Sequence, residues 1–426
     1  MREPADRAVL VGAPDRDVPV RLAQEHLDEL GRLTDTAGGS VVATVVQRVS
    51  HPHPRFYIGE GKAQELADLV REQGADLVVF DEDLSPAQGK GLEDLLGVRV
   101  MDRSELILDI FATRARSKEA RMQVELAQLE YMLPRLRRMW SHLSRIRGGI
   151  GLRGPGETQL ETDRRLIGKR IGELRRKLGD VAKARAVQRK GREGHFRAAL
   201  VGYTNAGKSS LLRALSGAEL FVEDRLFATL DPATRAVSLG NGYQALVTDT
   251  VGFIRKLPHD LVASFRSTLE EAREADVLLH VVDASHSDWE EHLEVVKEVL
   301  ADLELGEHDT ILVFNKVDRL THSEEDALRD RMRALEPRPA VFVSAFDDRS
   351  LDALRETLKA RLQARLAHVV VRVPAEDGEA IAALYREADV EQRVDHDSVV
   401  SLTARVPRPL LGRLVGRSGV VVDEVA

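Results

Sequence analysis

The sequence contains no cysteine, and this absence excludes disulfides, thiolate metal sites and cysteine nucleophiles from all 426 residues. It also lacks any apolar run near the roughly 18 residues that a membrane-spanning helix requires. The first residues mix both charges and lack the apolar core of a secretory signal. We therefore expect a cytoplasmic protein with no membrane span, and we expect it to act as a monomer.

The residues that are present have an ordinary composition but an uneven charge. Apolar residues make up 43% of the chain, which excludes wholesale disorder, and the net charge is −8. Residues 112–192, however, hold 22 Lys and Arg against 8 Asp and Glu, so the rest of the chain is strongly acidic. One basic segment on an acidic protein indicates an anionic partner such as nucleic acid. A solvated helical surface with unbalanced charge is the alternative.

Hydrophobic periodicity divides the chain into four parts, and residues 1–111 form the first. Short β-branched or apolar runs alternate there with helical patterns, which is typical of an α/β domain with a mostly parallel sheet. The expected strands are residues 8–11, 41–46, 77–80 and 98–101, and the expected helices are 20–33, 61–73 and 85–96.

The second part, residues 112–192, predicts a helical hairpin. Apolar residues recur four and three positions apart from Met122 to Leu143, and a second such stripe runs from Ile167 to Val181. Pro134 lies inside the first stripe and should kink that helix. Between the stripes, residues 147–156 include five glycines and a proline, which cannot continue either helix. The pattern predicts two antiparallel helices with a basic, glycine-rich tip at residues 147–157.

The third and fourth parts are an α/β domain over residues 195–367 and a small α+β domain over residues 369–426. In the third part, strands and helices alternate as in a doubly wound fold. Its expected strands are residues 197–201, 245–248, 277–282, 310–314 and 340–344.

A phosphate-binding motif opens the third part. Residues 202–209 read Gly-Tyr-Thr-Asn-Ala-Gly-Lys-Ser, which matches G-x-x-x-x-G-K-[ST] between an apolar strand and a helical run. The glycines allow backbone N–H groups to surround phosphates at a helix N-terminus. Lys208 can reach the β- and γ-phosphates, and the Ser209 hydroxyl can hold Mg²⁺.

Three further elements follow in order, each at the end of an expected strand. In Asp249-Thr250-Val251-Gly252, the Asp249 carboxylate is expected to contact Mg²⁺ through water. The Gly252 N–H is expected to contact the γ-phosphate. In Asn315-Lys316-Val317-Asp318, the Asp318 carboxylate can accept both hydrogen bonds that guanine offers and adenine does not. Ser344-Ala345 can present a backbone N–H to guanine O6. Together these elements predict a GTP-binding domain and a Mg²⁺-dependent GTPase.

The chain resembles the translation-factor-like branch of P-loop GTPases in one further motif. Thr229, within residues 227–232, matches the switch threonine that coordinates Mg²⁺ while the γ-phosphate is present. Phe253 departs from Ras-like enzymes, which carry a water-orienting glutamine there. Asn205 matches an asparagine that helps to hold K⁺ in some related GTPases; a hydrogen bond that shapes the loop is the alternative role. We therefore expect Mg²⁺ as cofactor, with K⁺ as a second candidate, and slow unaided hydrolysis.

The other motifs narrow the resemblance to HflX-type ribosome-associated GTPases. Residues 148–165, 57–62 and 227–235 closely resemble signatures of that family, and the likeness extends over essentially the whole chain in the same domain order. The resemblance implies binding to the large ribosomal subunit and, in several members, splitting of stalled or idle ribosomes. A ribosome assembly factor and a GTP switch acting on a protein partner remain alternatives. A phosphate site at Gly59, Gly61 and Lys62 also remains open beside helix capping or RNA contact.

Motifs and resemblance together assign the following site residues. Catalytic roles go to Lys208, Thr229 and Gly252, and Mg²⁺ contacts to Ser209, Thr229 and Asp249. GTP or GDP contacts go to Gly202, Tyr203, Thr204, Asn205, Ala206, Gly207, Lys208, Ser209, Ser210, Phe227, Ala228, Thr229, Asp249, Thr250, Val251, Gly252, Asn315, Lys316, Asp318, Ser344 and Ala345. Contacts to ribosomal RNA go to Arg145, Arg147, Arg153, Arg164 and Arg165, because arginine pairs with phosphates and stacks on bases.

Overall fold

The N-terminal part folds around a four-stranded sheet whose strands are short because each apolar run is short. We describe the protein from a computed structural model over residues 6–136, 155–190, 195–217, 226–240, 242–257, 266–335 and 338–424. The strand order is β2-β1-β3-β4 and every pair is parallel. The elements are β1 (Arg7–Gly12), α1 (Val20–Ala37), β2 (Ser40–Val46), α2 (Glu60–Gln73), β3 (Leu77–Phe80), α3 (Pro86–Leu96), β4 (Arg99–Asp102) and α4 (Arg103–Arg114).

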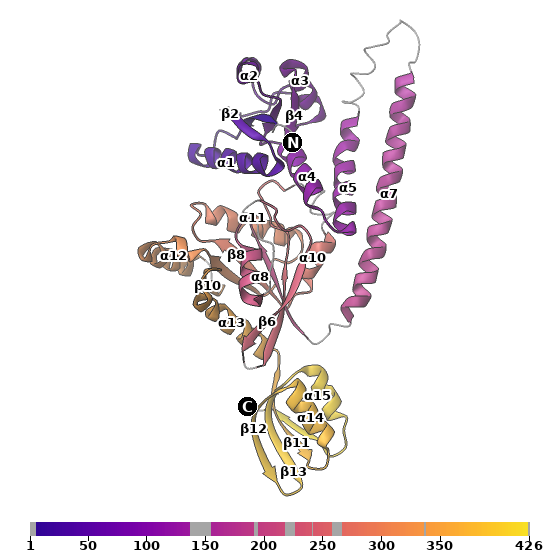
Figure 1. Ribbon diagram of the computed structural model, residues 1–426, viewed down its shortest axis with the longest axis vertical. Helices are drawn as coiled ribbons and strands as arrows, with labels where there is room; N and C mark the ends of the chain where they lie inside the picture. The colour runs from indigo at the N-terminus through magenta and orange to yellow at the C-terminus, as the bar shows by residue number, and fades with distance from the viewer. Residues whose placement is uncertain are drawn as a thin grey trace.

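Two long helices, α5 (Lys118–Met132) and α7 (Pro155–Lys190), run antiparallel beside this domain (Figure 1). Their apolar stripes meet in a small core of Met122, Leu126, Ile171 and Leu174. The α-helix ends at Met132 and a 3₁₀ turn, η1 (Leu133–Arg135), contains the expected proline kink. Of the expected tip, residues 147–154 lie outside the described residues, and residues 155–157 form the start of α7 rather than part of a loop. Among the described residues no helix is both long and apolar enough to cross a membrane.

The central domain has a six-stranded sheet in the order β10-β9-β8-β5-β7-β6. Neighbouring strands are parallel, except that β6 pairs antiparallel with β7 at the edge. The sequence did not predict β6, because its residues form no continuous apolar run. The strands are β5 (Phe196–Gly202), β6 (Ala233–Gly240), β7 (Tyr243–Asp249), β8 (Val277–Asp283), β9 (Thr310–Asn315) and β10 (Ala340–Phe342).

Helices cover both faces of the central sheet, as expected for a doubly wound fold. Apolar residues of α8 and α13 pack on one face, and those of α10, α11 and α12 pack on the other. The helices are α8 (Lys208–Ser216), α10 (Arg266–Arg273), α11 (Trp289–Asp302), α12 (His322–Leu335) and α13 (Asp348–Gln363), with a 3₁₀ turn η2 (Val317–Arg319) after β9. This arrangement brings the ends of β5, β7 and β9 to one edge, where the predicted motifs lie.

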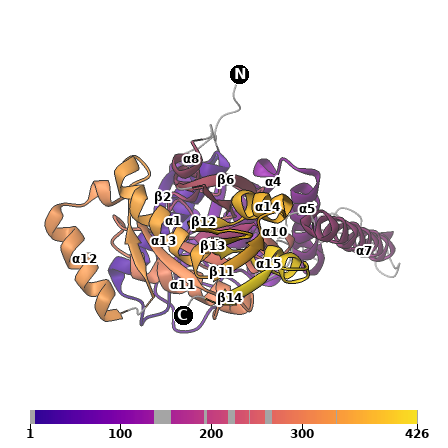
Figure 2. The same cartoon turned by 90° about the horizontal axis from the view of Figure 1, so that it is seen from below.

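The C-terminal domain is an antiparallel sheet in the order β12-β13-β11-β14. Its helices pack on one face through Ala380, Leu384, Leu410 and Leu414. The elements are β11 (Ala367–Pro374), α14 (Gly378–Glu387), β12 (Asp389–His396), β13 (Val399–Val406), α15 (Arg408–Val415) and β14 (Val421–Glu424). This domain lies at the opposite end of the molecule from the N-terminal domain (Figure 1). Seen from that end, α7 and α12 project to opposite sides (Figure 2).

Candidate nucleotide-binding site

The predicted phosphate-binding loop connects β5 to α8, and two of its glycines are required by close contacts. A Cβ on Gly202 would lie 2.3 Å from the carbonyl oxygen of Val281, and one on Gly207 would lie 2.3 Å from Nδ2 of Asn315. Both glycines also have positive φ angles. The loop therefore packs tightly against the strand ends and directs the N-terminus of α8 at the place where phosphates would bind.

Lys208, the first residue of α8, lies inside this loop. Its ammonium donates hydrogen bonds to the carbonyl oxygens of Gly202 (3.0 Å) and Tyr203 (2.8 Å). Burial lowers the pKa of Lys208 to about 8, although the nearby carboxylate of Asp249 favours the charged form. An anionic phosphate at this position would raise the pKa of Lys208 toward its ordinary value.

Three side chains predicted as magnesium ligands lie together beside Lys208. The Ser209 hydroxyl is 2.7 Å from the Thr229 hydroxyl, and it donates a 2.6 Å hydrogen bond to Oδ2 of Asp249. Oδ1 of Asp249 is buried without a hydrogen-bond partner among the described residues, and burial raises the pKa of this carboxyl. Two hydroxyls and an unsatisfied carboxylate oxygen form an all-oxygen donor set that fits Mg²⁺.

Gly252 lies directly over the loop, because the segment that follows β7 pairs with it. The Thr204 N–H donates to the carbonyl of Phe253 (2.7 Å), and the Phe253 N–H donates to the carbonyl of Gly202 (3.1 Å). A Cβ on Gly252 would lie 2.8 Å from Cα of Thr204 and 3.0 Å from Nζ of Lys208. The Phe253 side chain is fully buried in the core. No water-polarising group therefore projects from position 253.

Asn315 and Lys316 connect the expected base site to the phosphate loop. The Asn315 amide donates to the carbonyl of Ala206 (3.0 Å), and its oxygen accepts from the Ala345 N–H (3.2 Å). The Lys316 ammonium donates to the carbonyl of Asn205 (2.8 Å). The base-recognition element at residues 315–318 is thus bonded both to the phosphate loop and to Ala345 of the last element.

Asp318 and an unpredicted aspartate complete this end of the site. Oδ1 of Asp318 accepts a 2.6 Å hydrogen bond from the Ser344 hydroxyl. Asp283, the last residue of β8, lies 2.7 Å from Nζ of Lys316 and holds the lysine stem across the site. The sequence motifs did not point to Asp283, although an aspartate at the end of a largely apolar strand was a usable signal. The geometry orients Asp318 and Lys316 before any base is bound.

A cavity joins the phosphate end of the site to the segment around Thr229. Every residue lining it was predicted as a nucleotide contact; they are Thr204, Asn205, Gly207, Lys208, Ser209, Ser210, Phe227, Ala228, Thr229, Thr250 and Gly252. Phe227 and Val251 have buried side chains that belong to the core. Of the predicted RNA contacts, Arg145, Arg147 and Arg153 lie outside the described residues. Arg164 and Arg165 are exposed on α7.

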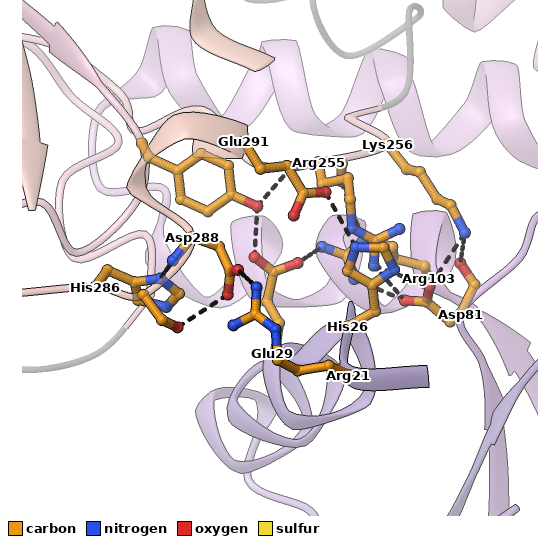
Figure 3. Close-up of polar contacts among 12 residues, drawn as sticks. Arg21, His26, Glu29, Asp81, Arg103, Arg255, Lys256, His286, Asp288 and Glu291 are labelled. Carbon is orange, nitrogen blue, oxygen red and sulfur yellow. Dashed lines mark hydrogen bonds and ion pairs between the residues drawn. The ribbon is translucent and has the colours of Figure 1, made fainter. Parts of the chain in front are cut away.

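The N-terminal domain contacts the central domain through a buried ionic cluster that the sequence did not reveal (Figure 3). The Arg103 guanidinium is 1% exposed, forms ion pairs with Glu29 and with Asp81 (2.8 Å), and donates to the carbonyl of Arg255 (3.1 Å). Arg255 and Lys256 in turn lie 2.9 and 3.1 Å from Asp81. Although burial opposes ionisation, the surrounding cations hold the pKa of Asp81 well below its usual range.

The cluster reaches the phosphate loop through Tyr203. The Tyr203 hydroxyl donates a hydrogen bond to Glu29 and accepts one from the N–H of Arg255 (2.9 Å). Its ring stacks on His292 of α11, with centroids 3.8 Å apart. One residue of the predicted phosphate loop therefore touches the N-terminal domain and the segment after Gly252 at the same time.

Comparisons with known proteins show which family the chain is similar to. Family models match residues 24–112 (GTP-binding GTPase N-terminal), 114–192 (GTP-binding GTPase Middle Region) and 197–316 (50S ribosome-binding GTPase). The GTPase HflX of Magnetococcus marinus is 44% identical over 424 residues, covering 98% of this chain and 97% of the relative. That of Escherichia coli is 43% identical over 406 residues, covering 94% of each chain. A GTP-binding protein from Sulfolobus solfataricus, solved with GDP, is 26% identical with a TM-score of 0.43, covering 84% of this chain and 99% of its own.

Proposed function

Because this chain belongs to the HflX family of GTPases, we propose that it couples GTP hydrolysis to binding of the large ribosomal subunit and to splitting of stalled or idle ribosomes. The observation that carries the proposal is the basic hairpin beside an otherwise acidic molecule. Helix α7 alone holds 11 Lys and Arg against 5 Asp and Glu, and the stretch around Arg164 and Arg165 is exposed. Such a helix is suited to the phosphates of ribosomal RNA.

In this proposal the nucleotide lies along the edge formed by the ends of β5, β7 and β9. The loop amides and Lys208 bind the β- and γ-phosphates, and the Gly252 N–H contacts the γ-phosphate. At the other end Asp318 accepts from the guanine N1–H and 2-amino groups, while Asn315 and Lys316 keep the base site joined to the loop. Support comes from the hydrogen bonds that already connect these residues without a ligand.

Magnesium would be held by Ser209 and Thr229, and by Asp249 through water. The unsatisfied buried oxygen of Asp249 supports this assignment. When bound, the ion supplies positive charge that stabilises the phosphate oxygens during phosphoryl transfer. The chain's own contribution is to orient these three donors and Lys208 around the phosphates.

Hydrolysis in the free protein should be slow, because Phe253 is buried and offers no group to orient water. We expect stimulation by large ribosomal subunits and by K⁺ over Na⁺. Asn205 lies in the loop with a positive φ and an exposed side chain, a position from which its oxygen can reach a cation beside the phosphates. A K⁺ effect that persists in Asn205→Ala would contradict the assignment of that residue but leave the ribosome proposal unaffected.

Sedimentation on sucrose gradients tests the function directly. Intact ribosomes are mixed with the protein and a non-hydrolysable GTP analogue, with GDP as the matched control. We expect the protein to co-sediment with large subunits and the ribosome peak to fall in the GTP-analogue sample only. Binding to isolated large subunits without loss of intact ribosomes would favour an assembly factor. An absence of ribosome binding in both nucleotide states would favour a switch that acts on a protein partner.

A further inference from the structure

The segment that carries Thr229 is bonded to the first residues of the hairpin helix α5. Asp231 accepts three hydrogen bonds there, from the N–H of Arg116 (3.3 Å), the N–H of Ser117 (3.0 Å) and the Ser117 hydroxyl (2.5 Å). Ser117 is also the N-cap of α5, since its hydroxyl oxygen accepts from the N–H of Ala120 (3.0 Å). One serine therefore begins the hairpin and holds the loop of the nucleotide site, 114 residues away in sequence.

Apolar packing fastens the same segment to the same place. Phe227 is 2% exposed, has a positive φ of 55°, and meets Phe111 of α4 edge to face with ring centroids 4.6 Å apart. Leu230 is buried in the core that contains Ala120 of α5. A left-handed backbone at a bulky residue is uncommon and persists only when the surroundings hold it. The packing of Phe227 against the N-terminal side is thus part of what shapes this loop.

The two ends of the short stretch from Thr229 to Asp231 have different partners. The Thr229 hydroxyl faces Ser209 at 2.7 Å, on the magnesium side of the site, and two residues later Asp231 is bonded to α5. Leu230 between them is buried, so the stretch has little room to move at one end independently of the other. Release of Thr229 from the phosphate site would therefore strain or break the contact at Asp231.

From this arrangement we propose that Ser117 and Asp231 form a latch through which the γ-phosphate state of the nucleotide controls the position of the hairpin. The inference rests on the proposed nucleotide site. With GTP bound, Thr229 stays at the magnesium side and Asp231 holds the start of α5. With GDP bound, Thr229 leaves, the latch opens and the hairpin changes its angle to the central domain. By reciprocity, any partner that holds the hairpin in the latched position strengthens GTP binding.

The hairpin is stiff enough to transmit such a change. Arg170 of α7 forms a bidentate pair with Glu125 of α5 (2.7 and 2.9 Å), and Arg175 reaches Glu130 (2.7 Å). The apolar seam between the helices adds to these pairs. A rotation at the first turn of α5 therefore moves α5 and α7 as one body.

A distance measurement in the free protein tests the latch. Because the chain has no cysteine, Gly168→Cys on α7 and Ala327→Cys on α12 give two unique sites for spin labels, and both positions are exposed. We expect the label-to-label distance distribution to differ between GDP and a non-hydrolysable GTP analogue. In Ser117→Ala and Asp231→Asn the two distributions should coincide. Identical distributions in the otherwise unmutated protein, or an unchanged difference in both latch variants, would overturn the proposal.

The preference of the protein for GTP over GDP provides a second readout. It would not change if Ser117 served only as the N-cap of α5. We measure the affinity for the GTP analogue divided by that for GDP, and expect Ser117→Ala to reduce this ratio about threefold to tenfold, as the loss of one hydrogen bond implies. Ser117→Thr keeps the hydroxyl and should restore it. The matched control is Ser85→Ala, which removes the N-cap of α3, where the serine hydroxyl accepts from the Gln88 N–H of its own helix. A ratio in Ser117→Ala equal to that in Ser85→Ala would overturn the latch.

These measurements use no ribosomes, so they separate the latch from the proposed function. A nucleotide-dependent distance that depends on Ser117 would support the latch even if sedimentation showed no ribosome binding. Ribosome splitting by the wild-type protein and by both latch variants at equal rates, with equal distances, would overturn the latch and leave the ribosomal function standing.

Discussion

At the scale of single residues, base selection should depend on Asp318. Its carboxylate can accept two hydrogen bonds from guanine, and Ser344 already orients it. Asp318→Asn replaces an acceptor by a donor that opposes the guanine 2-amino group, so GTP affinity should fall by roughly 2–4 kcal/mol. Calorimetric titration with GTP and GDP measures the loss.

The same exchange predicts a gain. Xanthine carries a carbonyl where guanine has its 2-amino group, so the Asp318→Asn variant should bind xanthosine triphosphate better than the wild-type protein does. Asp326→Asn on α12 is the matched control, because it makes the same chemical change at an exposed position outside the site. Equal GTP affinity in all three proteins would remove Asp318 from base recognition.

The lowered pKa of Lys208 predicts that nucleotide binding depends on pH. Its pKa is lowered to about 8 in the ligand-free site, and bound phosphates should raise it again. Below that pKa the lysine is already charged and affinity should be constant. Above it, binding must take up a proton, so GTP affinity should fall by up to about tenfold per pH unit. Affinity measured from about pH 7 to about pH 9 tests this, and Lys208→Arg, which stays charged, should show a flat profile.

At the scale of elements, α7 should provide electrostatic attraction to RNA. Arg164 and Arg165 are exposed on its N-terminal half, so the double change to alanine should weaken binding to large subunits. Each lost phosphate contact should reduce the slope of log affinity against log salt by about one. Co-sedimentation at several salt concentrations measures both effects.

The matched control for α7 is α12. Arg331→Ala with Arg333→Ala removes the same charge from exposed positions on the opposite side of the molecule (Figure 2). Affinity for GTP in free solution should be unchanged in both double variants, because neither touches the nucleotide site. If the α12 variant weakened ribosome binding as much as the α7 variant, the attraction to ribosomal RNA would come from the net charge of the protein rather than from the hairpin.

At the scale of the whole molecule, the buried ionic cluster should determine how firmly the N-terminal and central domains are joined. Arg103→Ala would leave Glu29 buried with its main ion-pair partner removed, which costs about 3–5 kcal/mol in comparable cases. Unfolding by urea and the overall dimensions from small-angle scattering should report a loosened N-terminal domain.

Arg21 offers the matched control, since its ion pair with Asp288 also bridges the two domains but its side chain is 68% exposed. Arg21→Ala should cost under about 1 kcal/mol. Equal stability of Arg103→Ala and Arg21→Ala would show that the cluster does not join the domains.

The contribution of the cluster to stability should depend on pH. Because the pKa of Asp81 is held low in the folded protein, this contribution is present above the ordinary pKa of aspartate, about 4, and is lost as the pH falls below it.

The sequence by itself determined the parts whose signals are local. Two glycines, a lysine and a serine at defined offsets identify a phosphate loop because the backbone must turn and expose its amides within eight residues. Heptad spacing likewise predicted the seam of α5 and α7, and Pro134 predicted a kink at the place where the structure has a 3₁₀ turn, since both depend only on neighbours along one helix. The α/β class followed from strand and helix periods in the same way.

Only the tertiary structure decided which distant residues meet. Nothing in the local pattern pairs Asp231 with Ser117, Tyr203 with Glu29, or Lys316 with Asp283, because each pair is joined by the packing of separate elements rather than by a repeat. The edge strand β6 was missed for a related reason: its stability comes from pairing with β7, which its half-exposed residues do not signal. The chemistry of the nucleotide site can therefore be predicted from local sequence motifs, whereas the contacts of that site with the N-terminal domain and the hairpin depend on the folded chain.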